Sequence, residues 1–413
     1  MIQFNRFILD NGLRVLVHED DTSPMAVINV MYNVGARNEN EAHTGFAHLF
    51  EHLMFGGSSN IPDFDEPLQR VGGENNAYTT NDLTNYYEQL PAANLETALW
   101  LESDRMLSLD FSQKSLDVQR KVVCEEFKEH YINKPYGDLW KIIREQAYTT
   151  HPYKWMTIGK ELSHIENATL DEVKSFFYEH YRPNNAILVI AGNVNTAEIK
   201  VLAEKWFGDI PAGKDQPQEI PQEPKQTTAK RITITKDVPV DVLVKSWHMG
   251  ARLDPDYYTT DLISDILGGG ASSRLHQRLV KEAKLFSSID CFHTGSIDAG
   301  LLSIEGKLVK GVSIEDAESA VDKEVQQIMT EKVAEKELEK VKNKTESMMA
   351  FEDLTLMSRA TNLAFYELLG NVNLINTELE FYQKVTPDDI LRVASALFQT
   401  SNSNTVHYLS SQK

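Results

Sequence analysis

The pattern of hydrophobic and polar residues predicts strands and helices that follow one another in mixed order. Alternating segments such as VINVMYNV and VLVKSWHM are typical of strands with one buried face, and AILVIAG is typical of a fully buried strand. Segments 168–185 and 385–402 each begin with a threonine cap, continue as an amphipathic helix and turn at an asparagine. Because the runs are mixed rather than strictly alternating, we predict an α+β fold in which antiparallel sheets pack with helices.

The same two segments indicate an internal duplication. ATLDEVKSFFYEHYRPNN at 168–185 aligns without a gap with VTPDDILRVASALFQTSN at 385–402, and this alignment pairs Asn185 with Asn402. A second related pair, VINVMYNVGAR and VLVKSWHMGAR, lies upstream in each half of the chain. We therefore predict two duplicated domains.

Length and composition also fit two domains. The chain has 413 residues, of which 41% are hydrophobic and 25% charged, and this length exceeds that of one ordinary core. The segment PAGKDQPQEIPQEPKQ is rich in Pro and Gln, which is typical of a linker. The predicted division is an N-terminal domain at 1–210, a linker at 211–230 and a C-terminal domain at 231–413.

Charge and cysteine content restrict the chemistry. With a formal net charge of −20 the chain lacks the excess of Lys and Arg that a nucleic-acid partner requires, and no apolar stretch reaches the roughly eighteen residues of a membrane span. The N-terminus shows no apolar signal region, so we expect a cytoplasmic protein, or a periplasmic one if a leader was removed before residue 1. Only Cys124 and Cys291 are present, which excludes a cysteine-based zinc module. A metal would have to bind His, Asp or Glu.

Residues 45–55 carry the predicted chemistry. They are apolar apart from His48, Glu51 and His52, which is typical of a buried helix. The two histidines are four residues apart and so share one face, while Glu51 lies one turn beyond His48 on the flank of that face. The His-x-x-Glu-His pattern predicts one zinc ion per chain, bound by His48 and His52, with Glu51 as the general base that takes a proton from water.

A catalytic zinc site usually has three protein ligands, so a third ligand is expected elsewhere. We predict a helix in the segment SLDVQRKVVCEEFKEHY. At about 100° per residue, the centre of its apolar face falls near Glu126, whereas Glu125 and Glu129 lie to one side. Glu126 is the predicted third ligand, and Glu125 and Glu129 are the alternatives. The apolar residues that define this predicted inward face are Val118, Val122, Val123 and Phe127.

Several motifs occur together in a familiar order and spacing. They are GFAHLFEHLMF, NNAYTTNDLTNYYEQLP, VVCEEF, HPYKWMTIG and YRPNNAILVIAGNV, with LGGGASSRLHQRLVKEAKLF in the second half. In these motifs the sequence resembles the insulinase, pitrilysin and mitochondrial processing peptidase family, specifically its shorter two-domain members. The resemblance implies that His48, His52 and Glu126 bind zinc and that Glu51 is the general base.

The resemblance also implies how a substrate is held. Asn76 and Ala77 would belong to an exposed edge strand onto which an extended peptide adds as an extra strand. An ordinary sheet edge without a ligand is the alternative for this segment. The implied architecture is two duplicated domains that enclose a peptide chamber, with the zinc motif only in the N-terminal domain. The implied activity is that of a zinc-dependent endopeptidase acting on peptides or unfolded segments.

Two departures from the family pattern change the expected partners. Gln119 stands where the family often has Glu, which would alter one contact beside the site. Val280 and Ser287 stand where members that work alone carry Arg and Tyr. We therefore predict the catalytic subunit of a heterodimer, in which a related chain without the zinc motif supplies the Arg and Tyr. The alternative is a homodimer or monomer that uses other residues: Arg274 or Arg278, with a tyrosine from elsewhere.

Two other interpretations stay open. A non-catalytic assembly subunit would not need the intact zinc motif that this chain carries. A maturation protease dedicated to one leader peptide would leave most of a mixed peptide library uncleaved.

Overall fold

The computed structural model of the chain describes residues 1–214 and 219–412, which cluster into two compact units. The chain passes from one unit to the other at 221/222, within the predicted linker, of which residues 215–218 lie outside the described residues. Two segments do not stay with the half predicted from sequence. Residues 131–154 of the N-terminal half belong to unit 2, and residues 350–376 of the C-terminal half belong to unit 1. Unit 1 comprises Met1–His130, Trp155–Pro221 and Ala350–Asn376, and unit 2 comprises Tyr131–Lys154, Gln222–Met349 and Thr377–Lys413.

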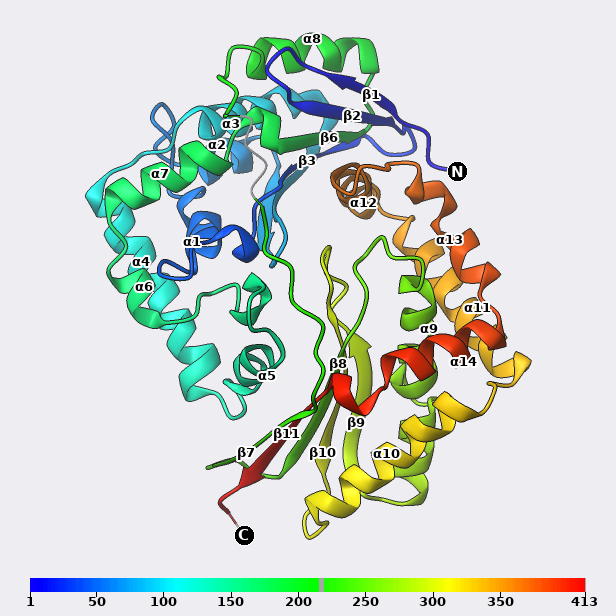
Figure 1. Cartoon of the computed structure of the whole chain (residues 1–413). Helices are drawn as coiled ribbons and strands as arrows, with labels where there is room; N and C mark the ends of the chain where they lie inside the picture. Colours follow the sequence, from blue (N-terminus) through cyan, green and yellow to red (C-terminus); the bar gives the residue numbers. More distant parts are fainter. Residues whose placement is uncertain (215–218, 413) are drawn as a thin grey trace. The chain divides into compact units, whose positions relative to one another are not determined.

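Unit 1 is built on a six-stranded sheet in the order β1-β2-β6-β3-β5-β4. Figure 1 labels four of these strands: β1, β2, β6 and β3. The pairing of β2 with β6 is parallel and the other pairings are antiparallel. Strand β4 pairs only with β5 and so forms one edge of the sheet. The strands are β1 (Asn5–Ile8), β2 (Arg14–Glu19), β3 (Met25–Tyr32), β4 (Glu74–Thr79), β5 (Thr84–Pro91) and β6 (Ala186–Gly192).

Helices cover the sheet of unit 1 and include one from late in the sequence. Val27 and Val189 pack in one hydrophobic cluster with Leu363 and Ala364 of α12, which contacts β3 and β6. Helix α1 contacts α4, α7 and strand β4. The helices are α1 (Phe46–Leu53), α2 (Asp65–Arg70), α3 (Leu95–Leu107), α4 (Gln113–Phe127), α6 (Leu162–Glu166), α7 (Leu170–His180), α8 (Thr196–Phe207) and α12 (Leu356–Leu368).

Unit 2 repeats this topology with one strand fewer. Its sheet has the order β7-β11-β8-β10-β9, which matches β2-β6-β3-β5-β4 strand for strand, including the single parallel pair. The strands are β7 (Lys230–Lys236), β8 (Val242–His248), β9 (Phe286–His293), β10 (Leu301–Leu308) and β11 (Ser403–Ser410). The helices are α5 (Leu139–Ala147), α9 (Tyr257–Gly268), α10 (Ile314–Thr330) and α14 (Pro387–Leu397), while α11 (Glu335–Glu352) and α13 (Leu374–Lys384) each have residues in both units.

The duplication extends to single hydrogen bonds. Asn185 Nδ2 donates to the carbonyls of Asn33 (3.2 Å) and His180 (2.8 Å). Asn402 Nδ2 donates to the carbonyls of His248 and Leu397, both at 2.9 Å. Each asparagine thus connects the C-terminal end of a helix with the end of the equivalent strand of its own sheet, β3 in unit 1 and β8 in unit 2. The predicted α+β duplication is confirmed, but each sheet is mixed rather than purely antiparallel.

No helix within the described ranges is both long and apolar enough to cross a membrane.

Candidate metal centre

Helix α1 is held by its apolar residues and leaves one polar face uncovered. Phe46, Leu49 and Phe50 are buried, and the Phe50 ring stacks on Phe176 and Tyr181 of the segment around α7. Tyr86 Oη donates to the Phe50 carbonyl at 3.3 Å, which fixes the helix on the sheet. The side chains on the remaining face are only partly buried: His48, Glu51 and His52.

The structure brings His48, His52 and Glu126 together. Nε2 of His48 lies 3.6 Å from Glu126 Oε2, and Nε2 of His52 lies 3.4 Å from the same oxygen. The candidate ligand atoms of the three residues all lie within 4.8 Å of one another, and they form the one such group among the described residues. Ligands of a tetrahedral zinc ion, each about 2.0–2.1 Å from the metal, lie about 3.3–3.4 Å apart. The observed spacing therefore fits zinc.

The charge state of His48 also fits a metal ligand. Burial, followed by the neighbouring imidazoles of His52 and His130, lowers the pKa of His48 to about 4. A neutral His48 cannot form a true ion pair with Glu126, but it offers a lone pair to a cation. Among the side chains that the structure describes, Glu51 makes no hydrogen bond or ion pair, so its carboxylate is available to accept a proton.

The phase predicted for α4 is wrong in part. Val118 and Val122, which were expected to point inward, are 50% and 40% exposed, and Leu116 and Cys124 are buried instead. The helix packs on α1 and α6, and this places its buried face about a quarter turn away from the predicted one. Glu126 flanks the buried face, where it meets the histidines.

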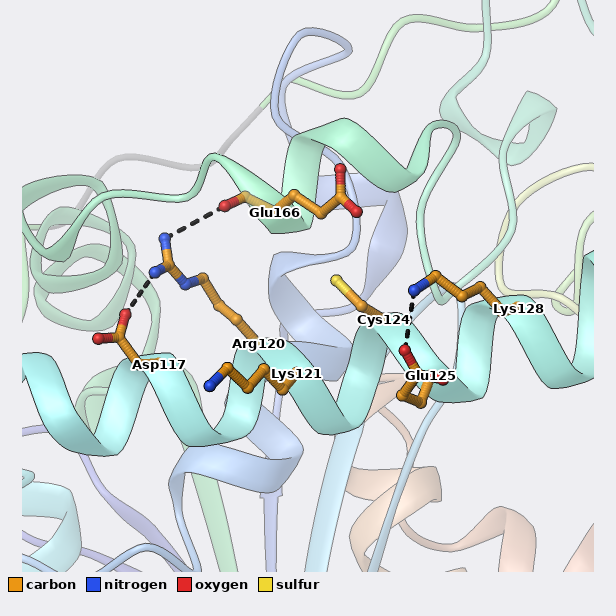
Figure 2. A pocket seen from close by; sticks show the side chains of 7 residues that line it. All are labelled: Asp117, Arg120, Lys121, Cys124, Glu125, Lys128 and Glu166. Atoms are coloured by element: carbon orange, nitrogen blue, oxygen red, sulfur yellow. Dashed lines mark hydrogen bonds and ion pairs between the residues drawn. The ribbon is translucent and has the colours of Figure 1, made fainter.

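The other acidic residues of α4 lie apart from this cluster. Figure 2 shows Glu125 paired with Lys128, at 2.8 Å, beside a groove whose floor includes Cys124. The Glu125 side chain is 73% exposed, and Glu129 is exposed as well. Arg120 at the other end of the groove donates to the carbonyl of Glu166 at 3.2 Å. Neither alternative glutamate joins the histidines in the metal group.

Strand β4 carries the two residues predicted to bind substrate. Asn76 is exposed and Ala77 half-buried, and they pair with Tyr87 and Tyr86 of β5. The Ala77 N–H donates to Asn76 Oδ1 at 2.8 Å. The position at the sheet edge, in contact with α1, agrees with the prediction, and the substrate role stays a prediction.

The N-terminus of α1 is capped by a residue that sequence analysis missed. Both carboxylate oxygens of the buried Glu39 accept backbone N–H groups, from Gly45 and Ala47, each at 2.8 Å. Burial raises the pKa of Glu39 to about 8, although the N–H groups of Gly45 and Ala47 act to lower it. Nothing in the local sequence distinguishes Glu39 from the nearby Glu41. Only the folded chain, which brings Glu39 to the first turn of α1, identifies it as the cap.

Unit 2 holds the residues on which the choice between a heterodimer and a homodimer or monomer depends. Val280 packs against the hydrophobic core, and the exposed Ser287 donates to the Lys307 carbonyl at 3.1 Å. Arg274 is engaged with Glu337, and Arg278 is engaged with other side chains: Glu324 and Gln327.

Comparison with known proteins extends the likeness over most of the chain. The model of Insulinase (Peptidase family M16) matches residues 14–160, and that of the Peptidase M16 inactive domain matches residues 167–345. The zinc protease PqqE of Helicobacter pylori is 28% identical over 404 residues, covering 96% of this chain and 91% of that protein. A probable mitochondrial-processing peptidase subunit beta of Arabidopsis thaliana is 23% identical and covers 83% of this chain and 66% of its own length. The crystal structure of a protease from Helicobacter pylori, 27% identical, superimposes with a TM-score of 0.94 over 99% of this chain and 100% of that chain.

Proposed function

We propose that this chain, which belongs to the insulinase family of M16 peptidases, is a zinc-dependent endopeptidase whose metal is held by His48, His52 and Glu126. The observation that carries the proposal is the convergence of both imidazole Nε2 atoms on one Glu126 oxygen, at distances of 3.4 and 3.6 Å. These distances are longer than ordinary hydrogen bonds and match the separation of ligands around one zinc ion.

Zinc, when bound, supplies a Lewis acid that polarises a carbonyl and lowers the pKa of water. Glu51 is the proposed general base, because it shares α1 with both histidines and makes no hydrogen bond or ion pair with the described side chains. It takes the proton from the attacking water and passes it to the nitrogen of the leaving amine. Placing the base on the same helix as two ligands fixes its distance from the reacting atoms.

The proposed substrate is an extended peptide that adds to β4 as an antiparallel or parallel neighbour. Strand β4 is the free edge of its sheet and contacts α1. An incoming strand would replace the contact between the Ala77 N–H and Asn76 Oδ1 with its own carbonyl. Backbone pairing of this kind selects unfolded segments over folded proteins, because only an extended backbone can present its carbonyl groups.

We further propose that the chain is the catalytic subunit of a heterodimer. Neither the half-buried Val280 nor the short Ser287 hydroxyl offers the cation and phenol expected at these positions, and Arg274 and Arg278 are engaged in ion pairs within unit 2. Loss of a donor that stabilises a developing oxyanion typically costs about 10²–10³ in rate. The missing groups would come from a related chain.

One preparation tests these proposals in order. The chain, purified without chelator, should contain about one zinc ion and retain it in Glu129→Gln but lose it in Glu126→Gln. Peptide cleavage is then measured for the chain alone and after addition of the related chain that lacks the zinc motif. Zinc-free protein would reject the metal site, and full activity without the second chain would reject only the heterodimer.

A further inference from the structure

Helix α1 depends on contacts outside itself for its first turn. It has eight residues, from Phe46 to Leu53, and helices this short are marginal on their own in water. Its N-cap residue Gly45 has no side chain to accept the unpaired N–H groups of the first turn. The backbone at Gly45 has φ of +89°, and a Cβ there would lie 2.6 Å from the Ile158 carbonyl oxygen, so no capping side chain can replace it.

Glu39 supplies this missing cap from outside the helix. Its two carboxylate oxygens each accept one N–H, from Gly45 and Ala47, so that the carboxylate bridges the N-cap and the first turn. Both oxygens therefore lie at the positive end of the helix dipole, where hydrogen-bond acceptors are favoured. His48 follows directly after Ala47, so the first turn that Glu39 holds is the one that carries the first histidine.

From this geometry we propose that Glu39 is a positioning residue that sets the orientation of His48, and with it the affinity of the site for zinc. The inference rests on the proposed metal site. A metal site requires its ligands within about 0.5 Å of their productive positions, and a first turn that frays or rotates moves the His48 imidazole by more than that. The contact acts through the backbone, because Glu39 does not touch the metal group itself.

The surroundings of Glu39 leave it little room to compensate. Glu39 is 5% exposed, and Thr44, which precedes the N-cap residue Gly45, is fully buried. Thr44 Oγ1 accepts the Lys160 N–H at 2.7 Å and lies 2.9 Å from His164 Nδ1. The segment before α1 is therefore fixed on two sides, and a change at Glu39 is transmitted to the helix rather than absorbed by the loop.

A purely structural cap would give a different result from a positioning residue, and the chain offers a matched control. Glu223 in unit 2 also accepts backbone N–H groups through its carboxylate, from Thr149, Thr150 and His151 at 2.8–2.9 Å. It does not belong to the metal group. Glu39→Gln and Glu223→Gln each replace one acceptor oxygen by an NH₂ group that faces an N–H donor. Glu39 is buried at the N-terminus of an α-helix, whereas Glu223 is half-buried and holds a loop.

The experiment compares zinc affinity with folding stability in these two variants. Metal-free full-length protein is titrated with zinc against a chromophoric chelator, and its unfolding by urea is followed without metal. Glu39→Gln should bind zinc about 10–100-fold more weakly than the natural chain, as for other residues that orient a ligand, whereas Glu223→Gln should keep the natural affinity. With cobalt(II) in place of zinc, the visible absorption band should change in Glu39→Gln only.

Two further outcomes decide the proposal. Natural zinc affinity and an unchanged cobalt spectrum in Glu39→Gln, together with reduced stability, would show that Glu39 is only a helix cap and overturn the inference. Absence of zinc binding by the natural chain would instead reject the proposed function. Glu39→Asp keeps the carboxyl group but is too short to reach both N–H groups, so it gives the same comparison, with a smaller loss of affinity, if Glu39→Gln does not fold.

Discussion

The two units share a strand order and differ most in the helix that follows the GAR segment. In unit 1 that helix is α1, with eight residues and a partly exposed polar face. In unit 2 it is α9, with twelve residues, and its apolar side chains Leu262, Ile263, Ile266 and Leu267 are all fully buried. The same sheet topology thus carries a fully packed helix in unit 2 and, in unit 1, a helix whose polar face holds candidate metal ligands.

The acidic residues of α9 serve structure rather than metal binding. Asp261 accepts hydrogen bonds from His293 (2.9 Å) and Tyr382 (2.6 Å), and Asp265 pairs with Lys344 at 2.7 Å. The two aspartates of α9 are therefore paired within unit 2, whereas unit 1 leaves two imidazoles and a carboxylate facing one another. Among the described residues the candidate metal ligands thus lie in unit 1 alone, although both units are built on the same strand order.

The largest difference between the units is expected in catalysis. Glu51→Gln on α1 should lower kcat/KM by about 10²–10⁴ while zinc content is unchanged, because the general base is removed and the ligands remain. Asp265→Asn on α9 should leave kcat/KM unchanged. The assay uses a fluorogenic peptide in the presence of the partner chain, with zinc measured by elemental analysis. A Glu51→Gln enzyme with the natural rate would break the assignment.

Removal of metal should loosen one unit and not the other. A ligand that binds only the folded site stabilises it by about 2.7 kcal/mol at a free concentration one hundred times its Kd. Amide hydrogen exchange before and after chelation should therefore show up to about 100-fold faster exchange in α1 and α4, and no change in α9. Equal acceleration in both units would contradict a metal site confined to unit 1.

A third prediction concerns the features that the units share. Asn185→Ala and Asn402→Ala each remove two hydrogen bonds to backbone carbonyls. Each substitution should lower the free energy of unfolding by about 1–3 kcal/mol, and neither should change zinc affinity. Denaturant unfolding of the two variants measures the first quantity. If only one variant had a lower free energy of unfolding, the two asparagine contacts would share a geometry but contribute differently to stability.

The smallest effect is expected just outside the metal group. Glu125→Gln removes a solvent-exposed carboxylate whose partner is the surface Lys128. Zinc content, kcat/KM and the midpoint of thermal unfolding should all equal those of the natural chain, since exposed pairs contribute little. Loss of zinc from Glu125→Gln would mean that the ligand lies one residue before the one proposed.

Sequence analysis succeeded where the signal is local. His48, Glu51 and His52 lie on one turn of one helix, so their shared face follows from spacing alone, and the repeated asparagines follow from alignment. Glu126 was selected from a helical phase that the structure corrects, because Val118 and Val122 are exposed. Contacts with α1 and α6 decide which face of α4 is buried, and no pattern within α4 contains that information.

Other features depend on partners distant in sequence. The cap that Glu39 forms on α1 requires the loop between them to bring Glu39 to the N-terminus of the helix. A single glutamate in a polar stretch of sequence does not predict this path of the loop. The segments 131–154 and 350–376 exchange units because their apolar faces fit the other sheet, which composition cannot show. The single parallel pair in each sheet likewise follows from the long connection between strands rather than from their residues.

The packing of α12 on the first sheet sets the order of events during synthesis. Val27 leaves the ribosome early, but its core neighbour Leu363 emerges only when most of the chain has been made. At about 5–20 residues per second the interval between them is roughly 20–70 s. Throughout that time one face of the sheet built on β3 lacks the cover of α12, so the nascent chain exposes apolar surface. A fragment that stops at residue 210 should stay in this condition permanently and aggregate.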